Sequence, residues 1–234
     1  MRRDDPDAGS IGSRPPLPAA PERVIEALGP MLTDERRARI EACLQQRTRS
    51  VVPVLEAVDD PHNVAAVLRS ADAFGIQEVH LIEGAEPFLA ARSVTQGSER
   101  WLDVVRHKGV SACLSALRTR GFRVYVATMD GEVTPEDLRG IAQVALVFGN
   151  EQYGASPAVK ALCDGRYTIP MHGFVQSLNV SVAAAITLFS ATRGRGGGLS
   201  QRDCTELRAR FMMHSVPRAE QVVREYLNRQ RQHA

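Results

Sequence analysis

The sequence predicts an α/β protein with a mostly parallel sheet. From Val51 onward, short apolar runs typical of strands alternate with segments whose apolar residues keep helical spacing. That alternation favours parallel strands joined by crossover helices. The chain has 234 residues, 44% of them hydrophobic, which is enough for one domain of ordinary size with further segments at its ends.

The first 50 residues are expected to lie outside the sheet. Residues 1–32 are predicted to be a disordered extension and linker, because the first 20 or so contain several prolines and glycines and no hydrophobic periodicity. Residues 33–50 are predicted to form a basic helix that starts at Thr33-Asp34-Glu35 and carries Ile40 and Leu44 on one side. Its five arginines against three acids fit either a solvated face or contact with RNA.

Residues 51–193 are predicted to form the α/β core. Strands are expected over 51–58, 78–82, 102–106, 122–128, 144–148 and from Tyr167 toward Met171, and helices over 63–74, 110–120, 156–163 and from about Ser177. Ligands of parallel sheets bind beyond the carboxyl ends of the strands, so the loops after Thr128, Phe148 and Met171 are the expected binding region. Neither the common glycine-rich dinucleotide loop nor a P-loop is present.

Residues 194–234 are predicted to be a basic helical tail. A glycine-rich hinge after Thr192 precedes two helical stretches, 205–214 and 217–231. Residues 51–192 carry a net charge of −4, whereas residues 193–234 carry +5, and every basic residue of the latter segment is an arginine. Arginine favours bidentate contacts to phosphate, although genomic base composition explains its frequent use equally well.

Other classes of protein are disfavoured by composition. No apolar run reaches the eighteen or so residues that a membrane span needs, and no apolar segment follows the N-terminal arginines, so we expect a cytoplasmic protein without a membrane partner. The four cysteines and six histidines show no paired spacing. We therefore expect reduced cysteines and no metal site.

Three stretches carry side chains suited to chemistry. In residues 59–75, Asn63 is a candidate N-cap, and Arg69 lies off the apolar stripe, where it can extend from the helix or pair with Asp72. In residues 146–157, Glu151 follows an apolar strand and sits between two glycines, which fits a ligand site or a simple turn.

The third stretch, residues 166–192, passes from a short apolar run through Gly173 into a helix. Ser177, Asn179 and Ser181 stand at the start of that helix. Exposed backbone N–H groups and the positive end of the helix dipole can hold a polar ligand there, or Ser177 can simply cap the helix.

Together and in this order, the three stretches resemble the sequence motifs of the TrmH (SpoU) family of RNA ribose 2′-O-methyltransferases, within the SPOUT class. The resemblance covers about residues 33–193. The matching motifs are Pro61-His62-Asn63 with Leu68-Arg69, Gly149-Asn150-Glu151 with Gly154, and Ile169-Pro170-Met171 with Gln176-Ser177-Leu178-Asn179 and the following Val180–Ala185. Gly97–Trp101 is similar to the branch that methylates guanosine 18 of tRNA.

The resemblance implies a deep trefoil knot at the C-terminal end of the core, a homodimer, and S-adenosylmethionine as cofactor. Knots are absent from nearly all folds, so periodicity alone does not predict one. By position, the cofactor-binding residues would be Thr128, Gly149, Ile169, Met171 and Leu178.

The resemblance also assigns catalytic positions to Asn63, Arg69, Glu151, Ser177 and Asn179. A guanidinium is effectively always protonated, so Arg69 is either a base activated by a substrate phosphate or a clamp on that phosphate. The family places this arginine near the cofactor of the other subunit, which implies an active site shared across the dimer.

The expected function is methylation of the ribose 2′-hydroxyl of guanosine 18 in tRNA. Two alternatives are a methyltransferase acting on 23S ribosomal RNA and a non-catalytic knotted RNA-binding protein. The expected RNA-binding residues are Arg36, Arg37, Arg39, Arg47, Arg49, Arg193, Arg202 and Arg208. Asp60, Tyr153, His172 and Phe174 depart from the guanosine-18 pattern and bear on the choice of substrate.

Overall fold

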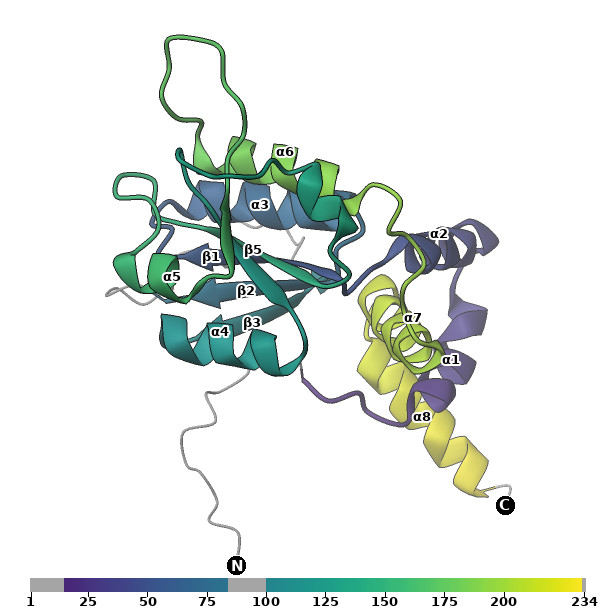
Figure 1. Ribbon diagram of the computed structural model, residues 1–234. Helices are drawn as coiled ribbons and strands as arrows, with labels where there is room; N and C mark the ends of the chain where they lie inside the picture. The colour runs from purple at the N-terminus through teal and green to yellow at the C-terminus, as the bar shows by residue number, and fades with distance from the viewer. Residues whose placement is uncertain (1–14, 84–99, 233–234) are drawn as a thin grey trace, which may run out of the picture. The chain divides into compact units, whose positions relative to one another are not determined.

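The computed structural model describes residues 15–83 and 100–232, which divide into two compact units (Figure 1). Residues 49–83 and 100–194 form an α/β unit, and residues 15–48 and 195–232 form a helical unit. Gly97, Ser98 and Glu99 of the guanosine-18 resemblance lie outside the described residues, as do residues 1–14 of the expected extension.

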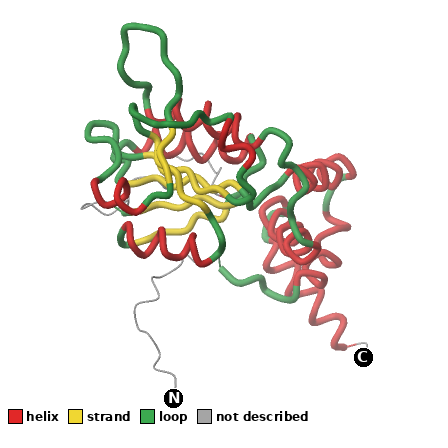
Figure 2. Tube along the Cα trace, in the orientation of Figure 1, coloured by secondary structure: helices red, strands yellow, loops and turns green. Residues whose placement is uncertain are grey.

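The α/β unit is built on one six-stranded sheet, and every strand pair in it is parallel. The strands are β1 (Val51–Glu56), β2 (Glu78–Ile82), β3 (Asp103–His107), β4 (Arg123–Ala127), β5 (Val144–Phe148) and β6 (Gly165–Tyr167). Their order across the sheet is β3-β2-β1-β5-β4-β6. Figure 2 draws the strands in yellow. The predicted fold class is therefore confirmed.

Helices cover both faces of this sheet (Figure 1). On one face lie α3 (Pro61–Ala73) and α6 (Val180–Thr192), and on the other lie α4 (Val110–Thr119) and α5 (Pro157–Leu162). A short 3₁₀ helix, η4 (Asp137–Gly140), contacts α6.

The sheet centre explains why the apolar runs form strands. All side chains of β1 and β5 are buried, and alternate residues serve two separate cores. Val51 and Leu55 belong to the core beside α3 and α6, whereas Val52 and Val54 belong to the core beside α4 and α5. Burial on both faces is the reason that these strands are continuously apolar rather than alternating.

The sixth strand is shorter than expected, because it ends at Tyr167 rather than continuing toward Met171. The N–H of Thr168 donates at 2.9 Å to the carbonyl of Val133, a residue of the loop after β4. The chain therefore leaves the sheet after Tyr167. Pro170 follows and has no N–H to offer a neighbouring strand.

The helical unit joins segments from both ends of the chain. It contains α1 (Pro21–Leu28), the 3₁₀ helix η1 (Gly29–Met31), α2 (Asp34–Gln46), α7 (Gln201–Ser215) and α8 (Ala219–Gln232). Helix α1 packs against α7 and α8, and α2 packs against α7.

The expectation of a linker up to residue 32 is wrong for residues 21–31. Pro21 stands at the start of α1, a favoured place for proline, and Val24, Ala27 and Leu28 form a buried stripe with helical spacing. None of the described helices combines the length and the apolar character that crossing a membrane requires.

Candidate active site

The three motif stretches meet at the carboxyl ends of neighbouring strands. β1 and β5 are adjacent in the sheet, and the loops that follow them are joined by Asn150. Its Nδ2 donates to the carbonyl of Ala57 and to Oδ2 of Asp59, both at 2.8 Å. Because parallel strands end at the same edge, loops distant in sequence come together here.

A chain of side-chain hydrogen bonds links one predicted residue from each stretch. Asn63 Nδ2 donates to Oε1 of Glu151 at 2.8 Å, and Asn179 Nδ2 donates to Oδ1 of Asn63 at 3.1 Å. Asn179 Oδ1 in turn accepts from the N–H of Ser181 at 2.8 Å and from its hydroxyl at 2.6 Å. We call Glu151, Asn63 and Asn179 the polar chain.

Glu151 also anchors the loop that precedes α3. Its carboxylate accepts from the backbone N–H groups of Asp59 and Asp60, at 3.3 and 3.4 Å. Asp60, which departs from the guanosine-18 pattern, is the N-cap of α3 and accepts from the N–H of His62 at 2.8 Å. The expectation that Asn63 caps this helix is therefore wrong, because α3 begins two residues earlier, at Pro61.

Asn179, rather than Ser177, is the N-cap of α6. Ser177 lies two residues earlier and is exposed to solvent. The capping role considered for Ser177 is therefore wrong, and its hydroxyl stands ahead of the helix. Asn179 serves two purposes, since one side-chain atom caps α6 and the other continues the polar chain.

Arg69 lies on another side of α3 from the polar chain. It stands six residues after Asn63 and is exposed, whereas Asn63 is 8% exposed. At 3.6 residues per turn, that separation turns Arg69 by roughly 120° around the helix axis and moves it about 9 Å along it.

The five positions assigned to the cofactor lie in the segments that follow β4, β5 and β6: Thr128 and Gly149 come directly after β4 and β5, and the other three lie between β6 and α6. Each of them is partly buried: Thr128, Gly149, Ile169, Met171 and Leu178. The strand order β5-β4-β6 makes these three strand ends neighbours. Partly buried apolar side chains next to backbone N–H and C=O groups suit a flat ring with polar edges.

Two close backbone contacts occur in these segments. A Cβ on Gly149 would meet the backbone N of Ala155 at 2.2 Å, so glycine is required where the loop folds back. A Cβ on Gly131 would meet the backbone C of Tyr167 at 2.2 Å, where the loop after β4 runs along the end of β6. The arrangement fits a ligand held largely by backbone.

That second contact is reinforced by hydrogen bonds. The N–H of Thr128 donates to the carbonyl of Tyr167 at 2.9 Å, and the N–H of Glu132 donates to the carbonyl of Arg166 at 3.2 Å. Burial raises the pKa of Tyr167 well above its usual range, so this hydroxyl stays neutral and is no candidate for a base.

Four of the eight expected RNA-binding arginines are held by contacts within the chain. Arg47 is 4% exposed and lies over the ring of Phe211, and Arg49 pairs with Asp103 at 2.6 Å. Arg208 binds Glu41 through two nitrogens, at 2.5 and 2.7 Å. The fourth, Arg37, contacts Asp34 and the carbonyl of Gly29.

The other four expected arginines are exposed. Arg36 and Arg39 lie on α2 and Arg202 on α7, all in the helical unit. Arg193 follows α6 in the α/β unit, with its guanidinium 5.8 Å from the ring centre of Phe189. These four remain predicted RNA contacts.

Asn150 was not singled out as a site residue in the sequence, although it joins the loops after β1 and β5. Its Oδ1 also accepts from the N–H groups of Gln152 and Tyr153, at 2.9 and 3.1 Å. An asparagine directly after a strand and a glycine is the available signal, because asparagine side chains often bind the backbone two residues on.

Comparison with known proteins places the chain beside RNA methyltransferases. Residues 50–189 match the model of the SpoU rRNA Methylase family. The tRNA (guanosine(18)-2′-O)-methyltransferase of Thermus thermophilus is 39% identical over 169 residues, 70% of this chain and 84% of the relative. The 23S rRNA (guanosine-2′-O-)-methyltransferase of Xanthomonas axonopodis is 38% identical over 153 residues, 64% of this chain and 61% of the relative.

Solved structures show the same fold. The TrmH/SpoU tRNA modifying enzyme of A. aeolicus superposes with a TM-score of 0.70 and 27% identity, over 79% of this chain and 98% of that one. The SpoU methyltransferase AviRb of Streptomyces viridochromogenes, in complex with AdoMet, superposes with a TM-score of 0.56 and 27% identity, over 68% of this chain and 62% of that one.

Proposed function

Since the chain belongs to the SpoU rRNA Methylase family, we propose that it methylates the ribose 2′-hydroxyl of guanosine 18 in tRNA, with S-adenosylmethionine as methyl donor. The observation that carries the proposal is the 39% identity to a guanosine-18 methyltransferase across 84% of that relative. The family match over residues 50–189 includes the polar chain.

The cofactor region supports S-adenosylmethionine as the donor. Thr128, Gly149, Ile169, Met171 and Leu178 would hold it, chiefly through backbone groups and apolar contact. S-adenosylmethionine supplies an electrophilic methyl group, so the protein has to place the ribose hydroxyl and manage its proton.

The polar chain acts as a positioning device. Each member fixes the orientation of the next, from Glu151 to Asn63 to Asn179, and so holds the loops after β1 and β5 against the start of α6. Ser177, exposed ahead of α6, is the hydroxyl best placed to contact RNA there. Pre-ordered polar groups of this kind need no rearrangement when the substrate arrives.

Arg69 is the group that we assign to the substrate. Its guanidinium stays protonated, which makes a clamp on a phosphate next to the reacting ribose a better role than a free base. Charge brought to the developing alkoxide lowers the barrier without a proton transfer to arginine. As the oxygen takes the methyl group and S-adenosylhomocysteine leaves, the hydroxyl proton passes to the bound phosphate or to water.

We propose a homodimer in which Arg69 serves the active site of the partner subunit. Within one chain, Arg69 points about a third of a turn away from Asn63 around the axis of α3. Val182, Ile186 and Phe189 form an exposed apolar stripe on α6, at 46%, 39% and 51% exposure, and α6 packs beside α3. A second copy seated on that stripe would bring its own Arg69 toward this site.

A trefoil knot over residues 166–192 is also part of the proposal. The close approach of Gly131 to Tyr167, and the hydrogen bonds beside it, bring two distant segments together backbone to backbone at the cofactor region. These contacts are what a threaded chain end would need.

The test of function is methyl transfer from labelled S-adenosylmethionine to unmodified tRNA transcripts. We expect label in a transcript with guanosine at position 18 and none in one with 2′-deoxyguanosine there. Equal labelling of both would reject the ribose hydroxyl as the target.

A 23S ribosomal RNA fragment is the third substrate, because a relative of that specificity is 38% identical. Labelling of that fragment alone would support the ribosomal alternative, and labelling of nothing would support a non-catalytic RNA-binding protein.

The test of the shared site combines two inactive variants, Arg69→Ala and Glu151→Ala, by co-expression. If the site is shared, each mixed dimer has one intact site, and random pairing restores about a quarter of wild-type activity. If each subunit uses its own Arg69, no pairing restores activity. Ile186→Asp should weaken the dimer by placing a charge in the apolar stripe, which light scattering would show.

A further inference from the structure

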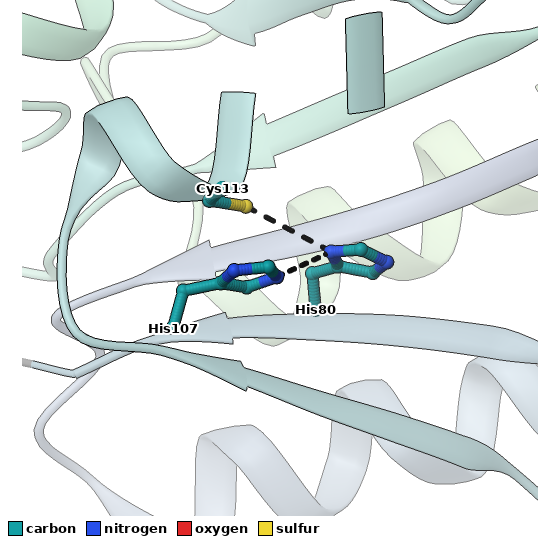
Figure 3. A group of neighbouring side chains, drawn as sticks. All are labelled: His80, His107 and Cys113. Carbon is teal, nitrogen blue, oxygen red and sulfur yellow. Dashed lines mark hydrogen bonds between the residues drawn. The ribbon is translucent and has the colours of Figure 1, made fainter. Parts of the chain in front are cut away.

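A second group of chemically capable side chains lies outside the candidate active site. His80 on β2, His107 at the end of β3 and Cys113 in the first turns of α4 converge (Figure 3). One nitrogen or sulfur atom from each lies within 4.8 Å of the others. His80 and Cys113 are buried, at 1% and 0% exposure, and His107 is partly buried.

We propose that His80, His107 and Cys113 bind a divalent transition-metal ion of the Zn²⁺ class. Two imidazoles and a thiolate are ligands that such ions prefer over the oxygen ligands of Mg²⁺ or Ca²⁺. Residue spacing alone predicts no metal site here, because the three residues come from separate elements.

The hydrogen bonds of His80 identify which of its nitrogens faces the cluster. Nε2 lies 2.7 Å from Oε1 of Glu78, and a carboxylate only accepts, so Nε2 carries the proton and Nδ1 a lone pair. His107 Nε2 and Cys113 Sγ both approach that Nδ1, at 2.8 and 3.8 Å (Figure 3). Two donors thus share one lone pair, whereas a metal ion would accept a lone pair from each of the three side chains.

The two distances to Nδ1 of His80 are close to those of a bound ion, and the remaining pair, His107 and Cys113, lies within 4.8 Å and would draw closer. Zn–N bonds of about 2.1 Å and a Zn–S bond of about 2.3 Å at tetrahedral angles put ligand atoms roughly 3.3–3.6 Å apart. The two histidine nitrogens would therefore separate by about half an ångström, and the sulfur would approach His80 slightly. Such shifts need only side-chain adjustment.

His80 has the support that metal-binding histidines usually have. Glu78 orients the ring and is itself held by Arg120, at 2.5 and 3.1 Å, and by Arg49, at 3.2 Å. A carboxylate behind a histidine fixes the tautomer and the direction of the ligating nitrogen. Three protein ligands leave one position of a tetrahedral ion for water.

The ion would cross-link the outer part of the sheet. Among the described strands β3 stands at the edge and pairs only with β2, and Cys113 belongs to the helix that covers this face. A metal bound to one residue of each element would fasten the edge strand to its neighbour and to α4. The assigned role is therefore structural and independent of methyl transfer.

The test uses the full-length chain, stripped with a chelator and titrated with Co²⁺ as an optical probe. We expect one Co²⁺ per chain, a sulfur-to-cobalt charge-transfer band, and displacement of Co²⁺ by Zn²⁺. Cys113→Ala should abolish the band and weaken binding by at least about 10–100-fold. Cys163→Ala, at a partly buried cysteine outside the cluster, is the control and should keep both.

A second pair of variants guards against a folding defect in Cys113→Ala. His107→Gln changes a partly exposed ligand and should weaken Co²⁺ binding, whereas His172→Gln, at an exposed histidine, should not. The proposal is overturned if the wild-type chain shows no thiolate band, or if folded His107→Gln and His172→Gln bind Co²⁺ alike. The cluster is then a hydrogen-bonded part of the core only.

Discussion

The two units of this chain differ in how their residues are used. In the α/β unit, β1, β2 and β5 are buried throughout, and polar side chains of the motif stretches gather at one edge of the sheet. In the helical unit, α2 buries only Ile40 and Leu44, and the three arginines of this helix are exposed. The difference suggests a division of work, with cofactor and chemistry in the first unit and charge for RNA in the second.

The largest expected effect tests the chemical half of that division. Arg69→Ala should lower kcat for methyl transfer by about 10²–10⁴-fold, because it removes the charge proposed to stabilise the transition state. Its effect on tRNA affinity should stay below about tenfold, since many other cations attract the phosphate backbone. Single-turnover rates and filter binding on the same samples separate the two quantities. A parallel loss of rate and affinity would make Arg69 a binding residue instead.

The next effect concerns the packing that shapes the cofactor region. Gly131→Ala should destabilise the protein by about 1–3 kcal/mol, because the new Cβ would overlap backbone atoms of Tyr167 and Thr168 that cannot move aside. S-adenosylmethionine affinity should fall as well. Urea unfolding and calorimetric titration give both numbers.

Gly173→Ala is the matched control for that substitution. Gly173 has open space where a Cβ would stand, so its replacement should change the free energy of unfolding by no more than about 0.5 kcal/mol. Equal stability of the two variants would mean that the segments at Gly131 and Tyr167 are not packed backbone to backbone, and would remove the support that this contact gives to the knot.

The sequence predicted the two units unequally well. The reason is the separation along the chain of the residues that interact in each unit. The strands and helices of the α/β unit were found within a few residues, because periodicity is local and Val51–Glu56 or Val144–Phe148 is apolar nearly throughout. Helix α1 was missed, since eight residues among prolines give a weak signal and its partners α7 and α8 lie about 200 residues away.

The candidate site divides in the same way. The motif resemblance named Asn63, Glu151 and Asn179, and the structure joins them by hydrogen bonds. It did not name the residues that support them. That Asp60 caps α3, and that Asn150 links the loops after β1 and β5, depends on side-chain geometry. The grouping of His80, His107 and Cys113 depends on strand order and on where α4 lies, which spacing along the chain does not encode.

A smaller effect tests the RNA half of the division. Arg36→Ala with Arg39→Ala should weaken tRNA binding by about tenfold at low salt and reduce the salt slope by about one for each phosphate that these arginines neutralise. Affinity for S-adenosylmethionine should not change. Arg224→Ala on α8 is the control, because this exposed arginine already pairs with Glu220 at 3.4 Å.

Point substitutions are preferable here to removal of residues 199–234. That deletion would take away α7 and α8 and so uncover Val24 and Leu28 of α1, mixing a folding defect with a loss of charge. If the double variant binds tRNA as tightly as wild type at every salt concentration, the arginines of α2 form a solvated face and the division fails on this side.

The smallest effect concerns the cohesion of the helical unit. Hydrogen bonds from Arg208 lower the pKa of Glu41 below its usual value of 4.5, an effect that burial opposes and the charge of Arg208 reinforces. A carboxyl whose pKa is lower in the folded chain adds stability above its unfolded pKa and loses it as pH falls through the folded value.

Glu41→Gln should therefore cost a few tenths of a kcal/mol at neutral pH, because the side chain is 44% exposed and solvent screens the pair. That cost should shrink as the pH falls from 4.5 through the lower pKa that Glu41 has in the folded chain. Thermal unfolding across this pH range measures the cost, with Glu35→Gln, at an exposed position of the same helix, as the control variant. If Glu41→Gln costs no stability at any pH, the pair between Glu41 and Arg208 does not hold α2 to α7, and apolar contacts alone join these two helices.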